Sequence, residues 1–405
     1  MLKPKKNYEK WIIISLIIFV TILTNIRMSS DAATIQYTQE QYDKLIRFGI
    51  TAPLGVVGYD LSEIHALSYL DWAKESTSIP DGIEYIHVIR VSDSAYANGE
   101  LLNSISPIIL ANLGDVWIIG NEPDRFCFQD SVNPELYAQR YFKIANKIRS
   151  LDPSAKLVFG SIVQPTPIRI RYLERAIDEL ILLSDNDKQQ AMGLIDIWST
   201  HAFILNEQPY QWGADIPVGF FTYDEEFLTN LGQGYCFTGE TYEKSISDAI
   251  KIFDYADTYS INIFQGRIIN FRQWLNSIGE RNKPLWITEF GSLLPDWQIR
   301  CKYEPYPDCS NPINGWPTQE DNIEYMINTF DFLLQSSTSL IGMPDDGNKL
   351  VQRWYWYSLN DHLYSFGGSL FDPDNNKEIT NQGIAYKNYI ELLIGPKIFL
   401  PLVRK

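Results

Sequence analysis

Short apolar runs, each followed by a loop and then an amphipathic segment, recur along most of this 405-residue chain. Six runs rich in β-branched and aromatic residues are interpreted as strands: 85–91, 116–120, 156–163, 195–203, 284–291 and 351–359. Several are apolar on both faces, which is typical of parallel strands covered by helices. Strand–helix alternation over this length predicts an α/β fold, with a parallel sheet closed into a (β/α)₈ TIM barrel.

Helix boundaries support this reading. Asn133 and Pro134 predict a cap and a first-turn proline for a helix over 135–150. Thr318 and Asp321 form the pattern of a capping box ahead of a helix over 322–335. Asn381 is expected to open a last helix, which runs to about residue 393.

The first strands are harder to place. Segments 52–59 and 66–72 could both be strands, but the interval between them is too short for a crossover helix. One of the two segments could instead be an N-terminal extension or a plug at the bottom of the barrel. We expect eight strands, with the helix between the first two missing.

The N-terminus resembles an export signal. Lys3, Lys5, Lys6 and Lys10 precede an apolar run over 11–23, and small residues follow it. The run is shorter than the roughly 20 residues of a membrane span, but it suits a signal peptide. We therefore predict three segments: a signal peptide or uncleaved anchor (1–32), one (β/α)₈ barrel domain (33–395) and a short tail (396–405). The protein is expected to be secreted or at the cell surface, with any membrane contact made by the uncleaved anchor.

The charge of the chain restricts its partners. Residues 1–32 carry five basic and two acidic side chains, so their removal takes the net charge from −16 to −19. Such a field repels nucleic acid and anionic lipid, which are therefore poor candidate partners. Neutral carbohydrate is compatible with this charge, and the protein is expected to act as a monomer.

Four cysteines fit an oxidising compartment. Cys301 and Cys309 lie eight positions apart in a stretch rich in proline and polar residues, where a disulfide would fasten a long loop. Cys127 and Cys236 could form a second pair, although four cysteines allow three connectivities. No histidine falls near a cysteine pair, so we expect disulfides and no metal or other cofactor.

Two strand-terminal glutamates are the candidate catalytic residues. Glu122 follows the strand that ends in Asn-Glu-Pro-Asp, and Glu289 follows the strand that ends in Thr-Glu-Phe-Gly. The functional face of a barrel lies at these C-terminal strand ends. Cleavage of a glycosidic bond needs two carboxyl groups, one protonated and one ionised. The interval between the two glutamates corresponds to about three βα units, which predicts the fourth and seventh strands.

This arrangement resembles clan A of the glycoside hydrolases, and among its members the poorly characterised bacterial enzymes and the fungal-type β-glucan hydrolases with an NEPD strand. The resemblance covers about residues 85–389. It implies a retaining glycosidase in which Glu122 is the acid/base, Glu289 the nucleophile and Asn121 a donor to the 2-hydroxyl of the sugar. The resemblance also implies that His201 lies beside the substrate. It further implies that the Trp-rich last strand forms the floor of the sugar site.

The other candidates have competing structural explanations. Arg90 could hold Glu289 ionised or form an ordinary ion pair. His201 could instead be a core histidine. We expect Trp356 rather than Trp354 to be the sugar platform, and either could be plain packing. The main alternative function is a non-catalytic carbohydrate-binding or surface protein on the same barrel. Metal hydrolysis or Schiff-base chemistry would need strand-end His pairs or a strand-buried Lys, which these strands lack.

The export prediction is tested by intact mass. Protein recovered from outside the cytoplasm should begin near residue 33, because a signal peptidase removes the basic and apolar segment. An exported species that still contains Met1 would favour the membrane anchor.

Overall fold

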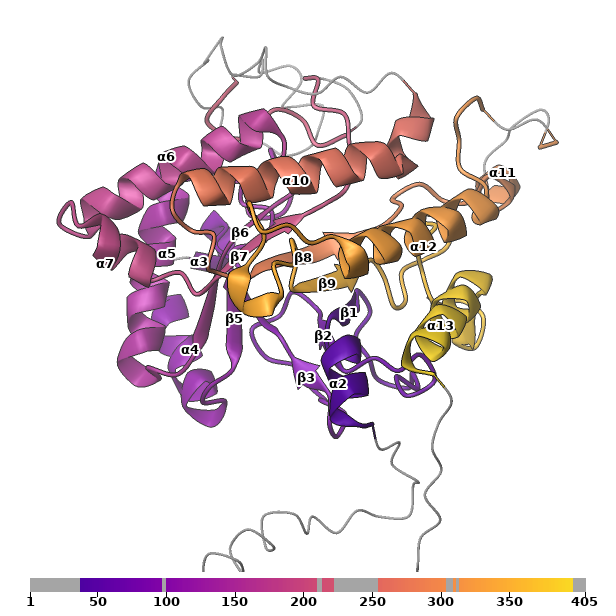
Figure 1. Ribbon diagram of the computed structural model, residues 1–405, viewed down its shortest axis with the longest axis horizontal. Helices are drawn as coiled ribbons and strands as arrows, with labels where there is room; N and C mark the ends of the chain where they lie inside the picture. Colours follow the sequence, from indigo (N-terminus) through magenta and orange to yellow (C-terminus); the bar gives the residue numbers. More distant parts are fainter. Residues whose placement is uncertain are drawn as a thin grey trace, which may run out of the picture. The chain divides into compact units, whose positions relative to one another are not determined.

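The computed structural model describes residues 37–96, 100–209, 213–221, 254–303, 309–310 and 313–395 (Figure 1). The chain divides into two units, Met1–Thr38 and Gln39–Lys405. The predicted signal segment and the C-terminal tail lie outside the described residues. None of the described helices is both long and apolar enough to cross a bilayer.

The strands form one parallel sheet that closes into a barrel. Its members are β1 (Phe48–Thr51), β2 (Ser68–Leu70), β3 (Glu84–Tyr85), β4 (His87–Ile89), β5 (Val116–Ile119), β6 (Lys156–Ile162), β7 (Ile197–His201), β8 (Leu285–Phe290) and β9 (Arg353–Trp356). The sheet order is β3-β2-β1-β9-β8-β7-β6-β5-β4. Because only Ile86 separates β3 from β4, these are two halves of one strand. The first half pairs with β2 and the second with β5, which closes the ring. The predicted eight-stranded (β/α)₈ barrel is confirmed.

Helices surround these strands (Figure 1). They are α2 (Gln39–Leu45), α3 (Asp93–Tyr96), α4 (Glu100–Ala111), α5 (Pro134–Leu151), α6 (Pro167–Leu183), α7 (Lys188–Gly193), α10 (Ile261–Ser277), α11 (Trp297–Tyr303), α12 (Gln319–Gln335) and α13 (Asn381–Ile394). Short 3₁₀ turns cover Tyr255–Tyr259 and Pro344–Asp346, and β10 (Phe371–Asp372) pairs with β11 (Glu378–Ile379).

The predicted helix starts agree with the structure. Asn133 accepts a hydrogen bond from the Leu136 amide, and Pro134 occupies the first turn of α5. Thr318 and Asp321 form the complete capping box of α12. These caps satisfy amide groups that have no partner within the helix.

The early strands required a correction. The first strand is β1, which ends at Thr51, so segment 52–59 is a loop at the barrel mouth and not a strand. Pro53, Gly55 and Gly58 in this loop disfavour continued strand pairing. No helix occurs within the described segments 52–67 or 71–83, so the predicted missing helix is confirmed and a second one is also missing.

The interior of the barrel is filled by apolar side chains. The cluster consists of Leu70, Ile86, Val88, Val116, Ile118, Val158, Ile197, Trp286 and Tyr355. A packed interior leaves only the ends of the strands for polar chemistry.

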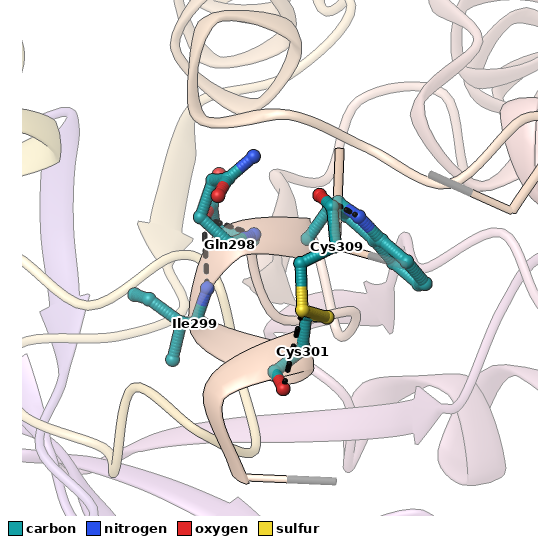
Figure 2. Close-up of a disulfide and its surroundings, with 6 residues drawn as sticks. Gln298, Ile299, Cys301 and Cys309 are labelled. Atoms are coloured by element: carbon teal, nitrogen blue, oxygen red, sulfur yellow. Dashed lines mark hydrogen bonds between the residues drawn. A yellow bond between two sulfur atoms is a disulfide. The ribbon is translucent and has the colours of Figure 1, made fainter. Parts of the chain in front are cut away.

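A disulfide fastens the loop that follows β8. Cys301 in α11 is bonded to Cys309, as predicted (Figure 2). The same loop is less polar than we expected, because Leu294, Trp297, Cys301 and Trp316 form a small apolar cluster. Cys127 is also disulfide-bonded, and Cys236 lies outside the described residues.

Removing this disulfide should destabilise the protein measurably. Chain-entropy arguments for a sequence separation of eight residues give about 2.5 kcal/mol for the Cys301→Ala/Cys309→Ala variant relative to the wild type. Urea denaturation followed by tryptophan fluorescence measures the difference. Peptide mapping without reduction should show the link in the wild type. An unchanged unfolding midpoint would mean that the apolar cluster alone orders the loop.

Candidate active site

The two glutamates lie at the C-terminal ends of their strands. Glu122 is three residues beyond the last residue of β5, and Glu289 is the penultimate residue of β8. Counting β3 and β4 as one strand, β5 and β8 are the fourth and seventh strands of the barrel. His201 ends β7, and sheet register pairs it directly with Glu289. These three predicted residues therefore meet at the barrel mouth.

The chain turns sharply to present Glu122. Gly120 has φ +93°, and a Cβ at this position would lie 2.9 Å from the Tyr137 ring. Glu122 itself has φ +40°, an uncommon conformation for a residue with a side chain. Its amide donates to the Ser161 carbonyl at 2.9 Å, which holds the turn against β6. Backbone strain of this kind is characteristic of functional sites.

His201 lies between the two carboxylates. Its Nδ1 is 3.2 Å from Glu122 Oε1, and its Nε2 is 3.3 Å from Glu289 Oε1. The first contact is aligned as a hydrogen bond, whereas the second is an electrostatic contact without that alignment. All three side chains are buried. One oxygen of each carboxylate and a ring nitrogen of His201 lie within 4.8 Å of one another.

Glu122 has a second positive partner. Arg125 Nη1 is 3.3 Å from Glu122 Oε2. Burial raises the pKa of Glu122, but the charge of Arg125 and the hydrogen bond and charge of His201 outweigh it and lower the pKa to about 2. The protein alone therefore holds Glu122 as a carboxylate.

Glu289 has the opposite electrostatic environment. Burial raises its pKa to about 7; the charge of Glu122 adds to this effect, while His201, the Trp72 N–H and Arg90 oppose it. Trp72 Nε1 donates to Glu289 Oε1 at 2.5 Å. Burial lowers the pKa of His201, but the two carboxylates raise it above its usual value overall. Of the two carboxyl groups, Glu289 therefore binds a proton more readily, whereas the acid/base role expected of Glu122 needs a proton there.

Arg90 and Asn121 are organised by a residue that the sequence did not reveal. Asp130 is buried, and its Oδ1 accepts from Arg90 Nε at 2.7 Å. Its Oδ2 accepts from the amides of Val91 and Asn121 at 2.9 and 2.8 Å. Arg90 thus forms an ion pair, and its charge also lowers the pKa of Glu289. The Asn121 side chain donates to Gln129 at 3.2 Å. No pattern around Asp130 distinguishes it from an ordinary loop aspartate.

Trp356 does not lie at the mouth. Its ring is fully buried against Phe290 and Phe330, and its N–H donates to the Gly368 carbonyl at 2.8 Å. It belongs to the layer between the barrel and α12, so the expected sugar platform is not there. Side chains alternate along a strand, and the prediction chose the wrong face.

Tyr357 and Trp72 are the aromatic residues beside the carboxylates. Their ring centroids are 6.0 Å apart, and the Tyr357 ring also contacts Phe203. Tyr357 feels the charges of Glu289 and Glu122, which contribute to the raised pKa of its hydroxyl. Trp72 is the last residue of segment 66–72. Its position at the end of a possible strand could have marked it as a site residue, but the sequence leaves the assignment of that segment as a strand open.

A buried ion network fixes the loops around the site. Arg169 on α6 pairs with Asp124 and, at 2.7 Å, with Glu207. Its other nitrogen donates to the carbonyls of Ala214 and Asp215 at 2.8 and 2.6 Å. Asp124 of the NEPD segment is thus a structural residue that holds these loops together through Arg169.

The glutamate–histidine cluster also has donor atoms that a metal could use. However, each carboxylate already accepts from a positive or N–H group, and both ring nitrogens of His201 face a carboxylate. We interpret the cluster as an acid–base arrangement.

Comparisons with known proteins found similarity in structure only. No family model and no curated protein sequence matches the chain. The structure is similar to a GH128 (subgroup I) endo-β-1,3-glucanase from Amycolatopsis mediterranei: TM-score 0.47, 14% identity, covering 85% of this chain and 99% of that one. It is also similar to a GH128 (subgroup VII) oligosaccharide-binding protein from Cryptococcus neoformans: TM-score 0.45, 15% identity, covering 90% and 99%. A monomeric β-xylosidase from Caulobacter crescentus CB15 gives a TM-score of 0.49 at 14% identity, covering 85% and 68%. Because these sequence identities and TM-scores are low, the assignment of function rests on the geometry of the candidate active site.

The role assigned to Asp130 predicts a large effect for a small change. Asp130→Asn replaces an acceptor oxygen by an amide NH₂, which leaves buried donors without a partner. We expect a loss of about 2–3 kcal/mol in unfolding free energy, measured by urea denaturation. Asp374→Asn is the control, because Asp374 pairs with His362 at an exposed site and should change stability by less than about 0.5 kcal/mol. Equal effects would contradict the proposed role of Asp130.

Proposed function

We propose that the protein is a glycoside hydrolase that cleaves O-glycosidic bonds, those of β-linked poly- or oligosaccharides, with retention of configuration. One observation carries the proposal: an oxygen of Glu122 and an oxygen of Glu289 lie within 4.8 Å of each other across the barrel mouth. Retaining enzymes place their carboxyl groups about 5–5.5 Å apart, whereas inverting enzymes need about 6.5–9.5 Å to admit a water.

In this mechanism Glu289 attacks the anomeric carbon while the glycosidic bond breaks. The leaving oxygen takes a proton from Glu122, and the sugar becomes bonded to Glu289. Glu122 then removes a proton from water, whose oxygen attacks the same carbon and releases Glu289. Two inversions give net retention. The Trp72 N–H supports the charge on Glu289, and His201, whose pKa is raised by the neighbouring carboxylates, lies 3.3 Å from Glu289 Oε1.

Neutral sugars suit the surroundings of this pair. Trp72 and Tyr357 offer aromatic faces beside the carboxylates, and sugar rings stack on such faces. The strongly negative charge of the chain disfavours anionic polymers. Screening purified protein on β-glucans, xylans, mannans and galactans identifies the sugar.

Export is part of the proposal. It is supported by the basic and apolar pattern of residues 1–32 and by the disulfide between Cys301 and Cys309, since stable disulfides form in oxidising compartments. The monomeric state remains a prediction.

A non-catalytic carbohydrate-binding protein is the second candidate. The observation in its favour is that both oxygens of Glu122 are engaged by positive side chains, so that the protein alone holds no proton on this group. Binding without cleavage across the polysaccharide panel would support this candidate.

Substitution of each glutamate separates their roles. Glu289→Ala should lower turnover on the order of 10⁴-fold or more for every substrate, because the nucleophile is always needed. Glu122→Ala should lower turnover of polysaccharide but spare activated aryl glycosides, whose leaving groups depart without a proton. Azide should rescue Glu122→Ala with retained configuration and Glu289→Ala with inverted configuration.

Glu135→Ala is the matched control, since Glu135 pairs with Arg175 on α6, both side chains are partly exposed, and no contact joins Glu135 to Glu122 or Glu289 among the described residues. It should keep wild-type turnover. If the rescue configurations are exchanged between the two glutamate variants, the roles are exchanged, as the pKa directions of the protein alone would suggest. Wild-type turnover in both variants would refute the catalytic pair.

A further inference from the structure

Both oxygens of Glu122 are already occupied. Oε1 faces His201 Nδ1 at 3.2 Å, and Oε2 accepts from Arg125 Nη1 at 3.3 Å. A general acid must bring one oxygen, with its proton, to the glycosidic oxygen of the substrate. A proton on either oxygen competes with the positive group that already faces it, so loss of one of these two partners favours the reaction of the proposed function.

Arg125 is the partner that can leave. The His201 side chain is 1% exposed, whereas that of Arg125 is 21% exposed. Arg125 is also loosely held: its contact with the Gly213 carbonyl is 3.3 Å, and its Nε has no hydrogen-bond partner among the described residues. Its guanidinium lies over the Phe128 ring, 5.4 Å from the centroid. Arg169, at the same end of the barrel, has all its nitrogens engaged and is fully buried.

We propose that Arg125 is a displaceable positioning residue: the leaving-group side of a bound substrate takes its place at Glu122 Oε2, and only then does Glu122 acquire the proton that it donates. This inference rests on the proposed function. The proton comes from solvent, passes from Glu122 to the leaving oxygen, and is replaced when Glu122 deprotonates the incoming water. When the products leave and Arg125 returns to Glu122 Oε2, Glu122 releases this second proton to solvent, so no net proton is gained or lost over one cycle.

Other charges near Glu122 do not change this order of events. The titratable groups that face it are Arg125 and Asp124 from its own loop, His201 from β7, Glu289 from β8 and Tyr357, which directly follows β9. Asp124, His201 and Glu289 are buried, whereas Arg125 and Tyr357 are partly exposed. Departure of Arg125 removes the largest favourable charge on the Glu122 carboxylate, and its pKa then rises towards that of a general acid.

Displacement of Arg125 by substrate makes the protonation of Glu122 depend on the bound substrate. A ligand too short to reach Arg125 leaves Glu122 ionised and is cleaved poorly. Binding energy from the leaving-group side would thus be used to assemble the acid, which is a form of induced fit. Arg125 would then favour oligosaccharide leaving groups over small ones that still need a proton.

The test begins with the free protein, where no substrate is needed. The titration of Glu122 is followed by ¹³C NMR of carboxyl-labelled glutamate, with the signal assigned by Glu122→Gln. In the wild type the midpoint should lie well below 4, and Arg125→Gln should raise it by about one to two pH units, a ten- to hundredfold gain in proton affinity. Arg125→Lys should largely restore the low midpoint. Arg175→Gln, which removes a surface arginine paired with Glu135, should leave it unchanged.

The second arm uses Glu289→Gln to prevent turnover and laminarihexaose, cellohexaose and xylohexaose as probes. Calorimetry in buffers of different ionisation enthalpy should show uptake of close to one proton on binding, and no uptake with Arg125→Gln at a pH where its Glu122 is already protonated. An unmoved NMR midpoint in Arg125→Gln, or binding without proton uptake, overturns the inference while the wild type still cleaves the sugar. Failure of all three probes to bind, together with no cleavage across the polysaccharide panel, overturns the proposed function itself and this inference with it.

Discussion

The contact of one buried imidazole with two buried carboxylates is the constraint on which the site depends. An isolated carboxylate in a packed interior costs several kcal/mol, so two of them at the barrel mouth need compensating positive charge. His201 lies 3.2 Å from Glu122 and 3.3 Å from Glu289, and the two carboxylates raise its pKa and so favour its positively charged form. The three residues come from β5, β7 and β8, and only a closed parallel sheet in this register brings them together. The barrel fold is therefore linked to the chemistry of the site by the need to place His201 beside both buried glutamates.

The surrounding structure keeps this cluster in place without filling the mouth. Asp130 ties the backbone at Asn121 to the end of β4, and Arg169 ties Asp124 to the loops that follow β7. Asp130 and both members of the Arg169–Asp124 pair are buried, and removing a partner from a buried charge is costly. Arg125, by contrast, is partly exposed and incompletely bonded. The rigidly held Arg169 is suited to structural support. The loosely held Arg125 is suited to being displaced by substrate.

The sequence predicted the barrel and its two strand-end glutamates because apolar runs that end in a carboxylate are a local pattern. The sequence-based prediction failed where a residue's role depended on which face of a strand its side chain occupies, or on contacts with residues far away in the chain. Trp356 and Tyr357 are adjacent in sequence, and the face that each presents follows from pairing with β1 and β8, where the register shifts near Phe290. Segment 52–59 is apolar enough for a strand, yet the last β1 residues that pair with β9 and β2 are Ile50 and Thr51, so the strand ends before this segment. Asp130 and Arg125 act through contacts across loops, which no local pattern encodes.

Covalent trapping tests the central claim most directly. The wild-type protein is incubated with an activated 2-deoxy-2-fluoro glycoside of the sugar that the polysaccharide panel identifies, and peptides are then mapped by mass spectrometry. Such a reagent slows both steps but lets the glycosyl-enzyme accumulate when the leaving group is good. Our account predicts one sugar adduct, located on Glu289, and none in Glu289→Ala. An adduct on Glu122, or turnover of the natural polysaccharide with inversion and no adduct, would contradict it.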